Sequence, residues 1–268
     1  MKKISVFLVL ILVLSIFLVG CQREEKSVLD KEVIKVGMEL KYPPFEYKDE
    51  KGEPVGASVD LAKALGEYLG KEVEIVDTPY PSLIPALDTG EIDIIISSMT
   101  ITEEREKKVD FSDPYTTSQL MMLVNIDSPI ESYEDLNNEE VIIASKTGTI
   151  GALWAQSNAS KAQIKNVEEE ATAVLEVAQG TADVFIYDPL SIIRHHENYP
   201  DQTKAILEPL PNTKGWGVAM RKGEEGLKAE IDAFLKEAKT DGTYDQIRED
   251  HLIEKQKEFE QYGIDFFF

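Results

Sequence analysis

The stretch DIIISSMTITEER, from Asp93 to Arg105, decides how the rest of the chain is interpreted. Its three consecutive isoleucines are typical of a strand that is buried on both faces of a sheet. A run of hydroxyl residues follows, and Thr102 has the features of a helix N-cap. Arg105 falls in the first turn of that helix, where the positive end of the helix dipole favours an anion over a cation. A guanidinium in this place is unexpected, because the unpaired N–H groups of the helix terminus already attract negative charge.

Short apolar runs alternate with amphipathic stretches on both sides of this segment. The apolar runs, which predict strands buried on both faces, span residues 33–38, 73–76, 92–96, 141–144 and 184–187. Helical spacing occupies residues 59–69, 83–89, 151–156, 171–179, 190–199 and 227–240. Because strands that alternate with helices form βαβ units, the chain predicts an α/β fold of parallel sheets with helices on both faces.

Two more strand-like segments interrupt the alternation, because neither is followed by a helix of the usual kind. They span residues 118–124 and 215–220. Both have the position expected of crossover strands that link two lobes. We therefore expect one lobe made of residues 33–124 together with 215–268, and a second lobe made of residues 125–214.

Length and charge narrow the class of protein. With 268 residues, the chain can form one large domain or two of about 110 to 130 residues. Its formal charge of −22 argues against nucleic acid as a partner, because phosphate binding requires clustered Lys and Arg. The same charge argues against lying flat on an anionic lipid surface. The simplest explanation of so many acidic residues is a solvated, soluble exterior.

The N-terminal sequence has the features of a secretory signal. Two lysines precede an apolar run that ends at the small residue Gly20. The sequence Leu-Val-Gly-Cys that ends at Cys21 resembles the bacterial lipobox, in which the cysteine is lipidated and the preceding segment is removed. We therefore expect a signal peptide at residues 1–20, a charged lipidated tether at residues 21–32, and an extracytoplasmic protein anchored to the cell membrane.

Two alternatives stay open for this segment. An apolar run of about 16 residues is only slightly shorter than a membrane-spanning helix, so it could be an uncleaved anchor. The signal could also be cut elsewhere, with Cys21 incidental. Cys21 is the only cysteine of the chain, so no intramolecular disulfide can form.

Polar residues follow several of the predicted strands. Ligands of open α/β sheets bind outside the carboxyl ends of the strands. Those ends carry Glu39, the run 97–100, the turn 146–149 and Asp188. If Arg105 reaches back over its strand end, it and nearby backbone N–H groups could bind one carboxylate-sized anion, which fits the fork-shaped guanidinium. An anion site and a separate carboxylate on two lobes suit a ligand that carries both charges.

Each of these residues also has a plainer interpretation. Arg105 could pair at the surface with Glu103, Asp110 or Asp113, an interaction worth only about 0.2–1 kcal/mol. Asp188, which precedes a proline, could simply cap a helix. The hydroxyl residues after the isoleucines could be turn residues.

Four stretches together resemble a known family. They are YPPFEYKDEKGEPVGASVDLAKAL, LIPALDTGEIDIIISSMTITEEREKKVDFSDPY, KTGTIGALWA and ADVFIYDPLSI. They are similar to the extracellular solute-binding proteins, family 3, of polar amino-acid ABC importers, and the resemblance runs from about residue 35 to residue 262. It implies the type II periplasmic binding fold, with two α/β lobes and a two-strand hinge.

The resemblance also implies which residues bind a ligand. Arg105 would bind the α-carboxylate of an amino acid, and Asp188 with the hydroxyl of Ser98 would take its α-ammonium. Backbone N–H groups would assist Arg105, at Thr100, Thr149 and Ile150. Ile150 stands where many relatives have threonine, so a hydroxyl contact would be lost there while the N–H is kept.

The pocket for the ligand side chain would include Glu39, Tyr42, Tyr80 and Lys146, with Phe45 and Met99 as apolar support. Glu39 alone suggests a basic ligand, because a buried carboxylate requires a cationic or amide partner. Lys146 argues the opposite, and the two could pair with each other, which would leave room for a neutral polar side chain such as an amide. Basic-amino-acid binders have a Phe-Asp pair where this chain has Ala-Ser at 57–58, which disfavours lysine or arginine.

We therefore expect the substrate-binding protein of an ABC importer, a monomer that closes on a polar amino acid by hinge motion and is read by a membrane permease. We expect no catalysis, no cofactor and no metal. The alternative is a dehydratase of an amino-acid precursor on the same fold, in which Glu39 could act as a general acid or base. Against it, His195, His196 and His251 lie in charged helices where solvent exposure is expected, and the sequence contains no nucleophile elbow.

A sensor module is a third possibility. The sequence YGIDFFF at the end of the chain contains neither a transmembrane helix nor a signalling domain, which disfavours this alternative. We expect the terminal phenylalanines to pack on the body of the protein.

Overall fold

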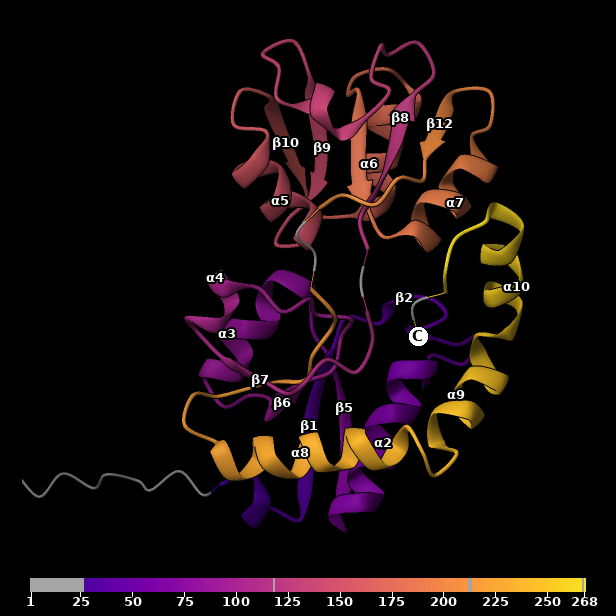
Figure 1. Ribbon diagram of the computed structural model, residues 1–268. Helices are drawn as coiled ribbons and strands as arrows, with labels where there is room; N and C mark the ends of the chain where they lie inside the picture. The colour runs from indigo at the N-terminus through magenta and orange to yellow at the C-terminus, as the bar shows by residue number, and fades with distance from the viewer. Residues whose placement is uncertain (1–26, 118, 212–213, 267) are drawn as a thin grey trace, which may run out of the picture.

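The computed structural model describes residues 27–117, 119–211, 214–266 and 268 (Figure 1). The predicted signal peptide and residues 21–26 of the predicted tether, which include Cys21, lie outside these residues. Two lobes are stacked one above the other, each built around its own five-stranded sheet. Within the described part of the chain, no helix is both long enough and apolar enough to cross a membrane.

The first lobe has a mixed sheet with the strand order β5-β1-β6-β13-β7. Its strands are β1 (Val33–Met38), β5 (Glu72–Asp77), β6 (Ile94–Ile95), β7 (Asp110–Phe111) and β13 (Ala219–Met220). Strands β5, β1 and β6 are parallel, whereas β13 runs antiparallel to β6 and β7. The helices of this lobe are α2 (Ala57–Leu69), α3 (Leu83–Asp88), α4 (Glu103–Glu106), α8 (Glu225–Ala238) and α9 (Thr243–His251). A small sheet of β2 (Lys41–Tyr42), β3 (Glu46–Lys48) and β4 (Pro54–Val55) joins β1 to α2.

The second lobe repeats this plan with the order β10-β9-β11-β8-β12. Its strands are β8 (Met121–Asn125), β9 (Ile142–Lys146), β10 (Gln163–Val167), β11 (Val184–Tyr187) and β12 (Thr203–Ile206). Helices α5 (Ile150–Asn158), α6 (Glu170–Ala178) and α7 (Pro189–Asn198) pack against them. Strand β8 is antiparallel to both of its neighbours. Short 3-10 segments lie at Val28–Asp30, Tyr80–Ser82 and Tyr133–Leu136.

The α/β prediction is confirmed, but the expectation of parallel sheets is wrong. The chain crosses between the lobes just before β8 and just before β13, and each of these strands enters its sheet antiparallel to the strands beside it. The expectation that all five apolar runs are buried on both faces fails for β5, an edge strand whose residues are exposed or half-buried. Because β8 pairs within the second sheet, we place the first crossover ahead of Met121 rather than at the expected 124–125 boundary.

The C-terminal helix α10 (Ile253–Tyr262) runs from the first lobe up to the lower end of the second, beside α7 (Figure 1). The hydroxyl of Tyr262 donates to Glu197 Oε1 on α7 at 3.2 Å. The chain then returns to the first lobe, where the ring of Phe268 stacks on Tyr244 with centroids 5.4 Å apart and lies 6.0 Å from Phe45. The described terminal phenylalanines therefore pack on the body as expected, while Phe267 lies outside the described residues.

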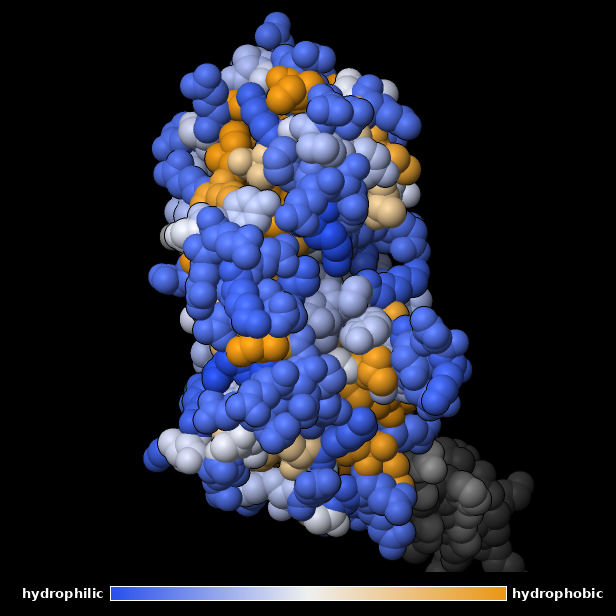
Figure 2. All heavy atoms as spheres, turned by 90° about the vertical axis from the view of Figure 1, so that its right-hand side faces the viewer, coloured by the Kyte–Doolittle hydropathy of each residue, from blue (hydrophilic) through white to orange (hydrophobic). Residues whose placement is uncertain are grey.

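The surface seen from the side of α10 is mostly hydrophilic, with only scattered hydrophobic residues (Figure 2). This face agrees with a solvated exterior for a chain of formal charge −22.

Helix α5 packs closely on β11 through Gly151, which allows a stability prediction. A Cβ added to Gly151 would lie 2.1 Å from the carbonyl oxygen of Ile186. Gly151→Ala should therefore lower the free energy of unfolding by about 1–3 kcal/mol, as other overpacking substitutions do. Gly226 on α8 is the matched control, because its Cβ would meet nothing closer than Leu29 at 3.7 Å. Gly226→Ala should instead raise the free energy of unfolding by up to about 1 kcal/mol. Chemical denaturation of both variants checks the pair, and equal effects would contradict the close contact.

Candidate functional site

A small cavity lies between the two lobes, where strand ends of both sheets meet. It measures about 40 Å³, because side chains from the two lobes close around it. Most of the predicted ligand-binding residues line it: Tyr42, Tyr80, Ser98, Thr100, Thr149, Ile150 and Asp188. Leu120, Tyr187 and Trp216 complete the lining. Three of the four predicted strand-end segments, 97–100, 146–149 and Asp188, therefore meet at this cavity.

Asp188 combines the two interpretations that the sequence left open. Its Oδ1 accepts from the backbone N–H of Ser191 at 3.0 Å, so it is the N-cap of α7. Its Oδ2 is buried and has no hydrogen-bond partner among the described residues. Burial raises the pKa of this carboxyl, and the negative charge of Glu170 adds to the effect. Oδ1 thus caps the helix, while Oδ2 is available to a ligand in the cavity. A buried carboxylate oxygen without a hydrogen-bond partner is costly, which favours such a ligand.

Ser98 and Thr100 form the opposite side of the cavity, on the segment that follows β6. Ser98 has a φ of 47°, a left-handed backbone conformation that is uncommon for residues other than glycine. The hydroxyl of Thr100 is buried and has no hydrogen-bond partner within the described part of the chain. Strained backbone and unsatisfied buried groups cluster at functional sites, so both observations indicate a binding site here.

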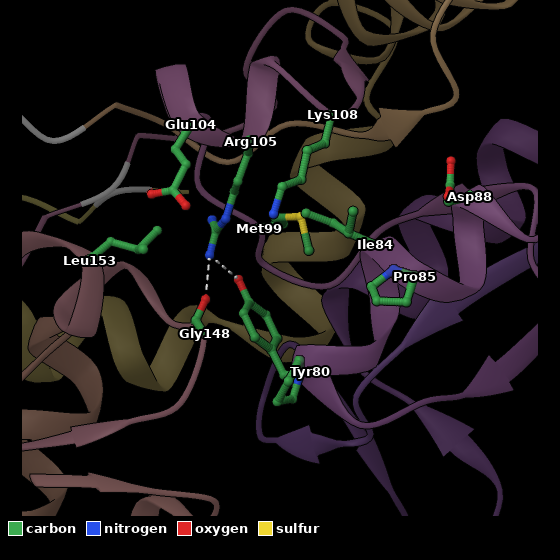
Figure 3. A pocket seen from close by; sticks show the side chains of 11 residues that line it. Tyr80, Ile84, Pro85, Asp88, Met99, Glu104, Arg105, Lys108, Gly148 and Leu153 are labelled. Carbon is green, nitrogen blue, oxygen red and sulfur yellow. Dashed lines mark hydrogen bonds between the residues drawn. The ribbon is translucent and has the colours of Figure 1, made fainter.

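Arg105 is buried, with an exposed fraction of 5%, and reaches back over its own strand end as predicted. The side chain of Thr102 caps the short helix α4 by accepting from the backbone N–H of Arg105 at 3.2 Å. The guanidinium donates to the carbonyl oxygen of Thr100 at 2.5 Å. It also donates to the carbonyl oxygen of Gly148 at 2.9 Å and to the hydroxyl of Tyr80 at 3.2 Å (Figure 3). The ion pairs of the described residues do not include Arg105, so the surface pairing with nearby carboxylates is not found.

A larger cavity lies on the other side of Arg105, also between the lobes (Figure 3). It measures about 520 Å³ and has apolar walls of Ile84, Pro85, Met99 and Leu153, with Lys108 and Glu104 at its edge. Met99 therefore supports this side of Arg105 rather than lining the small cavity. Arg105 lies beside the small cavity but is one of the residues that line the larger one, because its three hydrogen bonds hold the guanidinium between them.

Glu39 and Lys146 face each other across the cleft and form a buried ion pair. Glu39 also accepts from the backbone N–H of Tyr80 at 3.2 Å. The ammonium of Lys146 lies 5.9 Å from the centroid of the Tyr80 ring. The structure thus realises the pairing that the sequence left as one of several alternatives, and each charge is already satisfied by the other.

Three cavity residues were not among the predicted site residues. Trp216 forms bridges with Thr100 and Thr116, and its ring packs edge-on against Tyr42 and Phe45 with centroids 6.1 and 5.0 Å away. Phe45 in turn stacks on Tyr42, with centroids 5.3 Å apart, and so gives the apolar support that was expected of it. Tyr187, at the end of β11, and Leu120 could have been found from their positions beside a predicted strand end and crossover.

The histidines lie outside the cavity. His195 is not solvent-exposed as expected, since only 12% of its side chain is exposed and its Nε2 lies 2.6 Å from Glu170. His196 contacts a threonine hydroxyl, and His251 lies 2.6 Å from Asp60. Within the described residues, no cluster of His, Cys, Asp and Glu could hold a metal ion. The expectation that the protein needs no metal or cofactor stays a prediction.

Two mixed α/β lobes, two crossovers and a polar cavity between the sheet ends define the type II periplasmic binding fold. The chain belongs to the bacterial extracellular solute-binding proteins, family 3, whose model matches residues 34–254.

Named relatives and a solved structure agree with this assignment. The chain is 30% identical over 225 residues to the L-cystine-binding protein TcyJ of Escherichia coli K12, which covers 83% of this chain and 84% of that protein. It is 32% identical over 228 residues to the ABC transporter glutamine-binding protein GlnH of Bacillus subtilis, covering 82% and 81%. The crystal structure of the ancestral amino acid-binding protein AncCDT-1, a precursor of cyclohexadienyl dehydratase, superposes with a TM-score of 0.72 at 39% identity, covering 84% of this chain and 99% of that one.

Proposed function

We propose that this protein captures a polar amino acid between its two lobes and delivers it to the permease of an ABC importer. The observation that carries the proposal is a pair of opposite charges on the two lobes: the buried Oδ2 of Asp188, which lines the small cavity, and the buried guanidinium of Arg105, which lies beside that cavity. An amino acid carries the complementary ammonium and carboxylate. The binding of cystine and glutamine by the named relatives supports the same class of ligand.

Hinge closure follows from the placement of these two groups. A ligand that contacts Arg105 on one lobe and Asp188 on the other binds the closed form more tightly and shifts the population towards it. Arg105 uses three of its five N–H groups on neighbouring oxygens, which leaves donors for a ligand carboxylate. A permease would then recognise the closed shape.

A thermal-shift screen tests the proposal directly. The chain from residue 22 onward would be screened against the twenty amino acids, because a ligand that binds only the native state raises the apparent melting temperature. We expect an upward shift with one or a few polar amino acids, and mass spectrometry should recover each ligand unchanged. Conversion of the ligand would instead support the dehydratase alternative. No shift with any amino acid would contradict the proposal.

The buried Glu39–Lys146 pair favours a ligand with a neutral polar side chain, such as an amide. Because each charge already has its partner, a cationic or anionic side chain would have to displace one of them. In Lys146→Met the carboxylate of Glu39 loses its partner, so we expect lysine or arginine to gain affinity relative to glutamine by about tenfold or more. Glu39→Gln should shift the ligand preference away from lysine and arginine. Calorimetry with cationic, anionic and neutral polar amino acids measures the effect of each variant.

Lys41→Met is the matched control for this prediction. Lys41 also pairs across the lobes, with Glu169 at 2.7 Å, but both side chains are more than half exposed. Its loss should leave the ligand preference unchanged. An unaltered preference in Lys146→Met would contradict the assignment of Glu39 and Lys146 to the side-chain pocket.

We further propose that lipidated Cys21 anchors the protein to the outer face of the cell membrane. The lipobox-like sequence before this cysteine supports the proposal, and so does membership of a family of extracellular proteins. Metabolic labelling with a palmitate analogue should mark the wild-type protein but not Cys21→Ser. Label that persists in the variant would contradict the anchor.

A further inference from the structure

Glu46, on β3, is a buried carboxyl group directly behind the cavity. Its exposed fraction is 1%, and its partners are hydroxyl groups. The hydroxyl of Ser98 donates to its Oε2 at 3.1 Å, and the hydroxyl of Ser97 lies 3.5 Å from its Oε1. None of the ion pairs within the described part of the chain includes Glu46. A carboxyl group this deeply buried without a cation is unusual, because burial of its charged form is costly.

The two serines join Glu46 to the ligand cavity. Ser97 accepts from the backbone N–H of Glu39 at 3.0 Å, so its own hydrogen is free to point to Glu46. Ser98 lines the cavity opposite Asp188, and its left-handed backbone turns the side chain towards Glu46. When Ser98 donates its only hydrogen to Glu46, its lone pairs remain available to accept from a ligand N–H.

We propose that Glu46 is a positioning residue that fixes the Ser98 hydroxyl as an acceptor for the ligand ammonium, and that binding releases a proton from Glu46 to solvent. This inference rests on the proposed amino-acid function. The ammonium would lie one hydroxyl group away from Glu46, where its positive charge favours the carboxylate over the carboxylic acid. The carboxylate then accepts from Ser98 more strongly than the acid would. The O–H bond of Glu46 breaks, and buffer takes up the proton.

The protonation of Glu46 in the free protein agrees with this mechanism. Burial raises the pKa of Glu46 to about 8, although the hydroxyls of Ser58 and Ser98 oppose the shift and the negative charge of Glu39 adds to it. At neutral pH most of the free protein therefore carries a proton on Glu46. The phenol groups of Tyr80 and Tyr115 also interact with Glu46 electrostatically.

Calorimetry in buffers of different ionisation enthalpy tests the inference. The ligand is an amino acid that raises the melting temperature in the thermal-shift screen. Its binding to the wild type at pH 7 should release close to one proton. Because binding releases a proton, affinity should fall by up to about tenfold for each unit by which the pH drops below 8. Glu46→Gln should bind with about tenfold lower affinity, release almost no proton and lose this part of the pH profile. Equal proton release by the wild type and Glu46→Gln would overturn the proposal.

Glu170→Gln is the control for the second possible source of a proton, Asp188. The charge of Glu170 raises the pKa of Asp188, and Glu170 is itself held ionised by His195 and Arg194. If the proton came from Asp188, its release would fall in Glu170→Gln. If it comes from Glu46, the release stays at the wild-type value. A fall in Glu170→Gln together with full release in Glu46→Gln would overturn the proposal in favour of Asp188.

The pH dependence of stability tests Glu46 without any ligand. A carboxyl whose pKa is raised in the folded state stabilises the fold below its unfolded value near 4.5 and loses that contribution as the pH rises through about 8. The melting temperature of the wild type should therefore fall relative to Glu46→Gln between pH 5 and pH 9. A difference in melting temperature that stays constant with pH would overturn the buried-acid assignment.

The two proposals fail in distinguishable ways. If the melting temperature shows the expected pH dependence but no amino acid binds, the proposed function fails and the proton-linked binding fails with it. If binding occurs without proton release, the linkage alone fails.

Discussion

Replacing Arg105 with alanine is expected to weaken amino-acid binding by about two to four decades. Arg105 is buried, and the present partners of its guanidinium are two carbonyl oxygens and one hydroxyl. In the variant, a ligand carboxylate buried at this place would lose its bidentate cationic partner. Removing one partner of a desolvated charge pair costs about 3–5 kcal/mol, which corresponds to that loss of affinity. Titration calorimetry with the best ligand of the thermal-shift screen gives the measurement.

Arg248 on α9 provides the control for this substitution. It pairs with Asp245 at 2.7 Å within one exposed turn of helix, an interaction worth only about 0.2–1 kcal/mol. Arg248→Ala should leave the dissociation constant unchanged. Arg105→Lys should recover only part of the affinity, because an ammonium keeps the charge but not the fork of N–H donors. An unchanged dissociation constant in Arg105→Ala would remove Arg105 from the binding site.

The second large effect is expected for Asp188, where binding and stability can be separated. Asn is about as good a helix N-cap as Asp, so Asp188→Asn should keep the bond to Ser191 and a nearly unchanged free energy of unfolding. It removes the negative charge of the buried Oδ2, so affinity for an amino acid should fall by about two to three decades.

Asp188→Ala completes this comparison. It should lose the same affinity and, because the cap is also removed, about 0.5–2 kcal/mol of the free energy of unfolding. Calorimetry and chemical denaturation of the two variants measure the two effects independently. Binding by Asp188→Asn as tight as that of the wild type would mean that Asp188 serves only as a helix cap.

The sequence predicts the local parts of this site well, because they depend on residues close together in the chain. A buried run ending in hydroxyl residues, a capped turn with Arg105 and an Asp-Pro step each identify a strand end, and parallel strands bring such ends to one edge of a sheet. The ion pair of Glu39 with Lys146 was one of several open alternatives, because the distance between the lobes does not follow from the local sequence pattern.

Features that arise from the crossovers were missed for the same reason. The antiparallel strands β8 and β13 are set by how the chain passes between the lobes, and their own residues do not distinguish parallel from antiparallel pairing. Trp216 reaches the cavity only because β13 returns to the first sheet beside β6. The role of Glu46 required knowing that β3 folds back beneath Ser98, a contact between residues 52 positions apart.

Trp216 also gives the protein an intrinsic optical reporter. The chain has only two tryptophans, and the other, Trp154, is buried in the second lobe with its indole N–H bonded to the carbonyl oxygen of Pro211 at 3.2 Å. Trp216 lines the cavity and pairs with Thr100 after β6 and with Thr116 before the first crossover, so we expect its surroundings to change when the lobes move or the cavity fills. In a Trp154→Phe background, the fluorescence of a single indole would follow ligand capture in real time without any attached label.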